Sequence, residues 1–401
     1  MQYLLIAFAY ISLFITLFWL QVLLFYRDER GRKLALPSVS VVVPVYNEEK
    51  TLGKTLRSLL AVDYPKNKFE VIVVNDGSAD NTRNVARSFS RVIYIEQENK
   101  GKAAALNAGL RKATGELFSC LDADSFIEKG ALKKNVKHFS DPHVGGVICA
   151  IKVYRPRMFI EKLQRIEYIM SVLIRKLMAR AHALFITPGV MSVYRTNVLR
   201  SLGGFSEGNL TEDFEMALRL HKHHYDIKIE TDGVGYTVVP QTWKALFQQR
   251  VRWFRGFIYN AWNYRGLFFR KEHGVLGSFQ LPAAVLGIVI LLVTMSIISL
   301  KFLRAFFYRV LDFLNLGWDV FKLIEPPTLR SFLSLDHMLI FPLILGLGFV
   351  LFFLFRAHRE SHERFRHPFS LFFYLWYYSI ILALCWTTAI IKEAFKTRRQ
   401  W

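Results

Sequence analysis

Cysteine is scarce in this sequence, which has only Cys120, Cys149 and Cys385 in 401 residues. No two of them have the spacing of paired zinc ligands, and an odd number in unrelated surroundings does not indicate a disulfide framework. Acidic side chains are also few, because 32 Asp and Glu face 53 Lys and Arg and leave a formal net charge of +21. Such a charge can attract nucleic acid, but we find no nucleic-acid-binding motif, so we expect no nucleic-acid partner.

Charged residues are absent from the first 26 positions. This run is longer than the roughly 20 apolar residues that a helix needs to cross a bilayer. A secretory signal has its cations before a shorter apolar run, whereas here they follow it. We therefore predict an N-terminal transmembrane helix at 1–26. The positive-inside rule places its start outside the cell and its cationic flank in the cytoplasm, at Arg27, Arg30, Arg32 and Lys33.

Long apolar runs are then missing between Pro37 and Gly274. A domain outside the bilayer is expected there, and the positive-inside rule places it in the cytoplasm. Beyond it, hydropathy predicts transmembrane helices at 274–300, 337–355 and 369–391. We therefore expect a multi-pass protein of the plasma membrane with the lipid bilayer as a partner.

The segment 301–336 has a different pattern, because charged residues interrupt pairs of Phe and Leu at near-helical spacing. This predicts an amphipathic helix in the membrane interface followed by a loop, and a helix of a soluble core is the alternative. Three crossings after a cytoplasmic domain put the C-terminus outside. The positive-inside rule instead favours a cytoplasmic position for the cationic tail. It also favours a cytoplasmic position for the Arg- and His-rich loop 356–367. The cations of the tail are Lys392, Lys396, Arg398 and Arg399.

The middle of the chain, 34–240, has the pattern of an α/β domain. Apolar runs alternate with segments of helical periodicity at 51–60 and 82–90, which predicts a mainly parallel sheet with flanking helices. In such sheets, ligands bind outside the carboxyl ends of the strands. The predicted strands lie in the runs SVSVVVPVYNEE, FEVIVVNDGSAD, RVIYIE and GELFSCLDADS, and three of them end in polar residues.

Two of these strand ends carry candidates for phosphate and metal chemistry. Asp122 and Asp124 follow the fourth run, and such a pair can share a divalent cation with a diphosphate. A plain loop is the alternative for a single D-x-D. Lys100 and Lys102 precede a helical segment whose start could hold a phosphate, although a solvated basic loop has the same composition.

Two further segments carry candidates for catalysis and acceptor binding. Glu212 and Asp213 follow Thr211, where one carboxylate could act as a general base, although Thr211 could equally cap a helix. The segment 241–273 is cationic, aromatic and amphipathic, and contains the run QQRVRW over 248–253. On its own, this segment favours a helix at the membrane surface.

Six motifs occur together in the order PVYNEE, VNDGS, GKAAALN, DAD, TED and QxxRW. Over about 39–256 the sequence therefore resembles the membrane-bound glycosyltransferase family 2 polysaccharide synthases, which make poly-N-acetylglucosamine, chitin oligosaccharide, hyaluronan and cellulose. The resemblance implies a GT-A fold, a nucleotide-diphosphate sugar and Mg²⁺ or Mn²⁺, beside an α-helical transmembrane region.

The resemblance also implies roles for single residues. Asp213 matches the catalytic base and Asp124 the metal ligand. Acceptor contacts are implied for Gln249, Trp253 and Gly189. Nucleotide and donor contacts are implied for Tyr46, Glu48, Asp76, Lys102, Asp122 and Arg252. One departure is Thr187-Pro-Gly-Val, where many polymerising relatives have Cys-Gly or Ser-Gly.

The function implied is that of an inverting, processive glycosyltransferase. It would move N-acetylglucosamine or another hexose from a UDP-sugar to a growing β-linked polysaccharide at the membrane. The alternative is a transferase that adds one sugar to a lipid or membrane-held acceptor. Four transmembrane helices in one chain are few for a polymer pore, so export through the same chain is not predicted. The oligomeric state is not predicted either.

Overall fold

The computed structural model describes residues 2–26, 35–318, 337–363 and 367–397. Its centre is an eight-stranded sheet with the order β3-β2-β1-β4-β7-β6-β8-β5. Strands β3, β2, β1 and β4 are parallel, β7 is antiparallel to both neighbours, β6 and β8 are parallel, and β5 is antiparallel to β8. The strands are β1 (Val39–Val45), β2 (Phe69–Asp76), β3 (Val92–Gln97), β4 (Leu117–Leu121), β5 (Ser125–Ile127), β6 (Val144–Val153), β7 (Val190–Arg195) and β8 (Asp226–Thr237). The predicted mixed, mainly parallel sheet and its first four strands are confirmed.

Helices cover both faces of this sheet, because the buried strands are apolar on both sides. Val41 of β1 packs in the cluster that contains Leu56 of α2, whereas Val42 packs in the cluster that contains Leu106 of α4. Neighbouring strand residues point to opposite faces, so β1 belongs to both cores. The short helices are α2 (Leu52–Leu60), α3 (Thr82–Arg87), α4 (Lys102–Lys112), α5 (Ala131–Asn135), α7 (Thr196–Ser201) and α8 (Glu212–Lys222).

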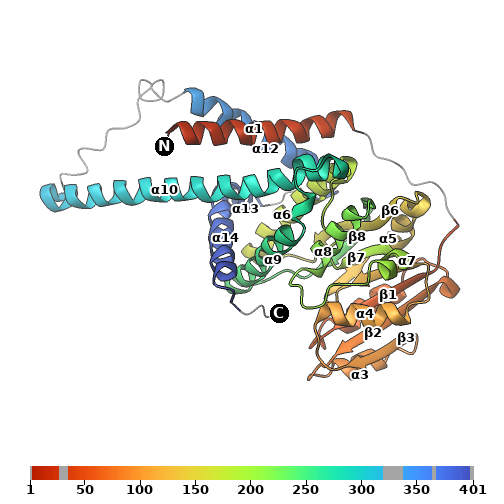
Figure 1. Cartoon of the computed structure of the whole chain (residues 1–401). Helices are drawn as coiled ribbons and strands as arrows, with labels where there is room; N and C mark the ends of the chain where they lie inside the picture. Colours follow the sequence, from red (N-terminus) through yellow and green to blue (C-terminus); the bar gives the residue numbers. More distant parts are fainter. Residues whose placement is uncertain (1, 27–34, 319–336, 364–366, 398–401) are drawn as a thin grey trace.

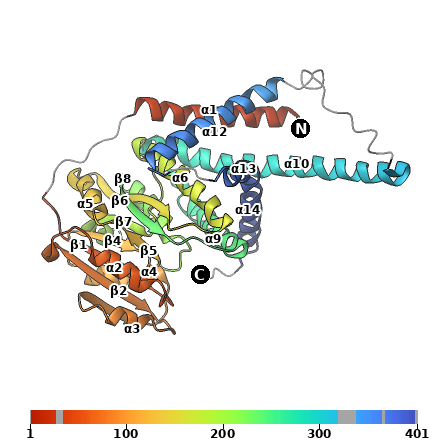
Figure 2. The same cartoon turned by 180° about the vertical axis from the view of Figure 1, so that it is seen from behind.

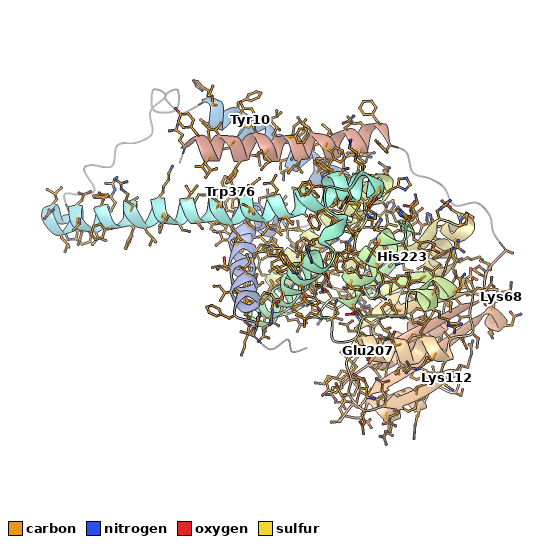
Figure 3. The ribbon with its side chains drawn as sticks, in the orientation of Figure 1. Tyr10, Lys68, Lys112, Glu207, His223 and Trp376 are labelled. Atoms are coloured by element: carbon orange, nitrogen blue, oxygen red, sulfur yellow. The ribbon has the colours of Figure 1, made fainter. Side chains whose placement is uncertain are left out.

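Two longer helices, α6 (Phe159–Arg180) and α9 (Trp243–Asn263), connect the α/β domain to a group of apolar helices. That group contains α1 (Gln2–Phe25), α10 (Leu281–Leu316), α12 (His337–Glu360), α13 (Pro368–Trp376) and α14 (Tyr378–Ala394). Figures 1 and 2 show α1, α10 and α12 side by side on one flank of the domain. Figure 3 shows the contrast in surface chemistry: the labelled Lys68, Lys112 and Glu207 lie on the α/β domain, and Tyr10 and Trp376 lie among the apolar helices.

Three helices of the described chain are long and apolar enough to cross a membrane: Gln2–Phe25, Leu276–Leu316 and His337–Glu360. The C-terminal end of α1, the start of the Leu276–Leu316 helix and the last turns of α12 meet α6 in one hydrophobic cluster, through Val22, Leu276, Ala357 and Leu173. All three helices therefore have one end against the α/β domain.

The predicted boundary at residue 300 is not found. The π-helical turn Leu276–Gln280 leads into α10, and together they form a helix of 41 residues. It is about 60 Å long, twice the roughly 30 Å hydrocarbon core of a bilayer. The chain has no Gly or Pro between Gly287 and Gly317, so nothing in its backbone chemistry interrupts the helix where the charged residues begin. The rest of the predicted interface segment, 319–336, lies outside the described residues.

The straight span predicted at 369–391 is instead a bent pair, because α13 and α14 meet at 45°. Both ends of the pair contact the domain side of the molecule. Phe369 packs on Phe159 of α6 at 5.6 Å between ring centroids, and Glu393 pairs with Arg255 of α9 at 2.7 Å. Figure 1 shows α14 running across the direction shared by α1 and α10. Taken together, the two helices are long and apolar enough to cross a membrane, and the exit of the C-terminus on the opposite side stays a prediction.

Packing accounts for part of the apolar character of α14. Cys385 and Ala389 are buried against Val251 of α9, whereas Leu384 and Ile391 are exposed. Hydropathy alone does not distinguish a segment buried in lipid from one buried in protein.

Candidate active site

A cavity of about 1260 Å³ opens where β1, β2 and β4 end. Its other walls come from α6, α8, α9 and α14. Every residue for which the sequence implied a role lines this one cavity: Tyr46, Glu48, Asp76, Lys102, Asp122, Asp124, Gly189, Asp213, Gln249, Arg252 and Trp253. Their individual roles remain predictions, but their common position is the arrangement that those roles require.

The end of β2 is held by Asp76. Its carboxylate accepts hydrogen bonds from Gln97 Nε2 at 2.7 Å and from the backbone N–H groups of Lys100 at 3.0 Å and Gly101 at 2.8 Å. The side chain is buried, with 3% exposed. Asp76 therefore orders the loop that leads into α4, which is a structural role beside the predicted contact with the nucleotide. Tyr46, half-exposed, lies at the rim of the cavity.

Lys102, the first residue of α4, bridges the end of β4 and the start of α8. Its Nζ lies 2.6 Å from Asp122 Oδ1 and 3.0 Å from Glu212 Oε1. Burial alone would lower the pKa of Lys102, but Asp122, Glu212 and Asp213 raise it well above its ordinary value. The lysine is therefore a fixed positive charge in the cavity.

Three carboxylates gather near the end of β4. Burial raises the pKa of Asp124 to about 7, and the neighbouring Asp122 and Glu48 add to the shift. Burial also raises the pKa of Glu48, whose carboxylate accepts a hydrogen bond from the Thr51 hydroxyl. Within the described residues, no group of three or more His, Cys, Asp or Glu side chains is arranged to hold a metal by itself. The crowding of like charges is nevertheless what a divalent cation shared with a phosphate would relieve.

Gly189 packs directly against Asp122. A Cβ atom at position 189 would overlap the Asp122 carboxylate, and the carbonyl of Gly189 accepts the Asp122 N–H at 2.9 Å. A side chain at 189 would therefore displace a predicted donor contact. Thr187, the departure noted in the sequence, donates its hydroxyl to the backbone carbonyl of Asp213 at 2.7 Å.

Asp213 opens α8. Its Oδ1 accepts the backbone N–H of Phe214 at 2.8 Å. The pKa of Asp213 is raised to about 6, mainly by burial and also by Glu212, against the opposing effect of Lys102. Thr211 occupies the N-cap position of α8, but its side chain makes no capping hydrogen bond, and its hydroxyl accepts a hydrogen bond from Asn260 Nδ2 at 3.0 Å.

The helix α9 presents Gln249, Arg252 and Trp253 to the cavity, as the i, i+3, i+4 spacing of one helix face requires. Arg250 lies on another face. It is buried, with 1% exposed, and its Nη2 lies 2.7 Å from Glu167 Oε2 of α6.

Aromatic side chains form the end of the cavity nearest the apolar helices. Phe254 of α9 stacks on Trp386 of α14 with ring centroids 4.0 Å apart and an angle of 5° between the rings. The remaining aromatic lining residues are Tyr168, Phe185, Phe214, Trp253 and Phe257, besides Tyr46 at the rim. Sequence reasoning missed Trp386, because nothing in its own segment distinguishes it from other apolar helix residues.

A second missed residue is Arg175 of α6, which also lines the cavity. Burial lowers the pKa of its guanidinium, and its buried Nη1 has no hydrogen-bond partner among the described residues. Its sequence surroundings, RKLMAR, gave no signal, because several neighbours on the same helix are also basic.

Residues 40–203 match the family described as Glycosyl transferase family 2. The chain contains a glycosyltransferase family 2 domain. It is 31% identical over 261 residues to a poly-beta-1,6-N-acetyl-D-glucosamine synthase of Staphylococcus epidermidis, which covers 61% of this chain and 63% of that protein. It is 33% identical over 229 residues to the synthase of the same name from Staphylococcus aureus, which covers 55% of each chain. The chain thus spans less than two thirds of the length of these curated relatives.

The fold of the glycosyltransferase domain and its helices also matches a solved structure. A mannosyltransferase from Pyrobaculum calidifontis, in complex with GDP-Man and Mn²⁺, superposes with a TM-score of 0.60 at 21% identity. The match covers 98% of this chain and 100% of that chain. The glycosyltransferase domain therefore has the GT-A fold that the motifs implied.

Proposed function

We propose that this chain is a membrane-bound, inverting glycosyltransferase that extends a β-linked polysaccharide from a nucleotide-diphosphate sugar. The observation that carries the proposal is the single cavity with two unlike ends. One end gathers the carboxylates and Lys102 at the strand ends, and the other presents Trp253 and further aromatic rings. The first end suits a nucleotide diphosphate, and flat aromatic faces suit sugar rings.

The charges of the cavity support a single displacement. Asp213 lines the same cavity, and its deprotonated carboxylate would take the proton of an acceptor hydroxyl as that oxygen bonds to the anomeric carbon. The bond from the anomeric carbon to the nucleotide diphosphate breaks on the opposite face. Lys102 and Arg252 would stabilise the negative charge of the departing diphosphate. Attack opposite the leaving group inverts the centre, so an α-linked donor gives a β-linked product.

The carboxylates at the end of β4 fit a divalent cation, because burial and mutual repulsion raise the pKa of Asp124 in its absence. Asp124 would hold Mg²⁺ or Mn²⁺, with Asp122 and Glu48 close by. When bound, the ion would supply positive charge to the leaving diphosphate.

The donor is proposed to be UDP-N-acetylglucosamine, because the curated relatives of the matched region are poly-beta-1,6-N-acetyl-D-glucosamine synthases. The test is to incubate the purified full-length chain with a panel of UDP- and GDP-sugars and Mn²⁺, and to measure the released nucleotide. We expect UDP release from UDP-N-acetylglucosamine to exceed release from the other donors. Preferred turnover of a GDP-sugar would contradict the donor assignment.

The arrangement of the helices supports an orientation with three crossings. The ends of α1, α10 and α12 that meet α6 would face the cytoplasm with the catalytic domain. The pair α13–α14 would lie along the inner face of the membrane, because it touches the domain side at both Phe369 and Glu393. The cationic tail then stays inside, as the positive-inside rule favours.

A further inference from the structure

One carboxylate oxygen outside the cavity receives donors from two helices. Glu167 Oε2 of α6 lies 2.7 Å from Arg250 Nη2 of α9. The hydroxyl of Tyr378 on α14 donates to the same oxygen, also at 2.7 Å. Tyr378 is itself buried, in a cluster with Leu246 of α9 and Ile160 of α6. The contact therefore joins three helices at one atom.

Arg250 also contacts two residues that line the cavity. Its Nη1 donates to Gln249 Oε1 at 2.8 Å, and its guanidinium lies over the ring of Trp253, 4.1 Å from the centroid. Gln249 and Trp253 line the cavity, whereas Glu167 and Arg250 do not. The ion pair can thus influence a bound sugar through Gln249 and Trp253.

We propose that Glu167 and Arg250 are positioning residues that fix the orientation of Trp253 and Gln249 for the sugar acceptor, and that Tyr378 ties this orientation to α14. The inference rests on the proposed function, because it assigns the acceptor end of the same cavity. A planar guanidinium held by a carboxylate offers one fixed surface beneath the indole. Without it, the Trp253 side chain has several staggered rotamers open to it, and the acceptor would be held less accurately.

The competing explanation is that the ion pair only holds α6 and α9 together. The chain offers a control of the same contact type, because α6 also forms an ion pair with a residue that follows α12. Arg165 Nε lies 2.7 Å from Glu363 Oε2, beyond the last turn of α12, and neither residue lines the cavity. Loss of that pair removes a contact of the same type and length without touching the acceptor end.

The experiment compares two reactions of the full chain in lipid nanodiscs with UDP-N-acetylglucosamine. Hydrolysis of the donor by water needs the donor site and the base, and transfer to a short N-acetylglucosamine oligosaccharide also needs the acceptor end. For Arg250→Lys we expect the KM for the oligosaccharide to rise at least about tenfold, because small displacements of a bound reactant cost large factors in rate. Donor KM and the hydrolysis rate should stay within about twofold of wild type.

Tyr378→Phe is the milder variant, because it removes one hydroxyl and keeps the ring. It should also raise the oligosaccharide KM, by a smaller factor than Arg250→Lys does. If Arg250→Lys does not fold, the KM of Tyr378→Phe tests the proposal. Arg165→Gln should leave both reactions unchanged. An unchanged oligosaccharide KM in the variants, or equal loss of hydrolysis and transfer, would overturn the inference. A wild-type chain that turns over no nucleotide sugar would instead contradict the proposed function.

Discussion

Asp213 carries the sharpest prediction at the scale of single residues. Asp213→Asn keeps an oxygen that can accept the Phe214 N–H but cannot take up the proton of the acceptor. General-base catalysis is typically worth about 10²–10⁴-fold in rate, so transfer should fall by at least about 100-fold. Melting temperature and UDP affinity should not change.

The pH dependence of transfer checks the same assignment. The pKa of Asp213 is raised to about 6 by burial, so the group is deprotonated at pH 7 and becomes protonated as the pH falls through 6. The transfer rate should therefore fall tenfold per pH unit below about 6. Glu207→Gln, on the exposed surface of the same domain, is the control and should keep the wild-type rate and profile. Near-normal transfer by Asp213→Asn would make Glu212 the next candidate for the base.

Asp124 carries the prediction for the metal. Asp124→Ala should abolish the stimulation of transfer by Mn²⁺ while the melting temperature stays close to wild type, because removal of a crowded carboxylate relieves repulsion in the metal-free protein. In the wild type, Mn²⁺ competes with a proton at a group whose pKa is about 7, so the apparent affinity for Mn²⁺ should weaken below that pH. Both are measured by titrating Mn²⁺ against the transfer rate. An unaltered titration in Asp124→Ala would remove Asp124 from the metal site.

At the scale of helices, the position of α13–α14 can be tested by labelling with thiol reagents. The native cysteines Cys120, Cys149 and Cys385 are buried, so an added exposed cysteine should dominate the signal. Lys396→Cys, just beyond α14, should react with an impermeant thiol reagent only after the cells are permeabilised. Tyr3→Cys, at the far end of α1 and 85% exposed, should react in intact cells. Labelling of Lys396→Cys in intact cells would show that α13–α14 crosses the membrane.

The same helices mark the limit of what the sequence predicts. The site residues at the ends of β1, β2 and β4 could be predicted, because strand ends of a parallel sheet meet at one edge and their polar residues interrupt clear apolar runs. The length of α10 and the bend at Tyr377 could not, because hydropathy reports apolar composition and not the surface against which a segment packs.

At the scale of the whole molecule, the cavity combines parts that lie far apart in the sequence. Trp386 of α14 lines the cavity together with Trp253 of α9, and Tyr378 of α14 contacts Glu167 of α6 outside it. No local sequence pattern predicts such contacts, because each depends on how α6, α9 and α14 pack together. This arrangement places Trp386 of α14 in the wall of the cavity.

The central claim is that the chain builds a polymer from a nucleotide sugar, and the mass distribution of its product tests it most directly. The full-length chain in lipid nanodiscs is given excess UDP-N-acetylglucosamine and Mn²⁺, and the products are resolved by mass spectrometry. We expect a ladder of masses separated by one N-acetylglucosamine residue, present in the wild type and missing in Asp213→Asn. A single glycolipid carrying one added sugar would contradict the account and favour a transferase that stops after one step.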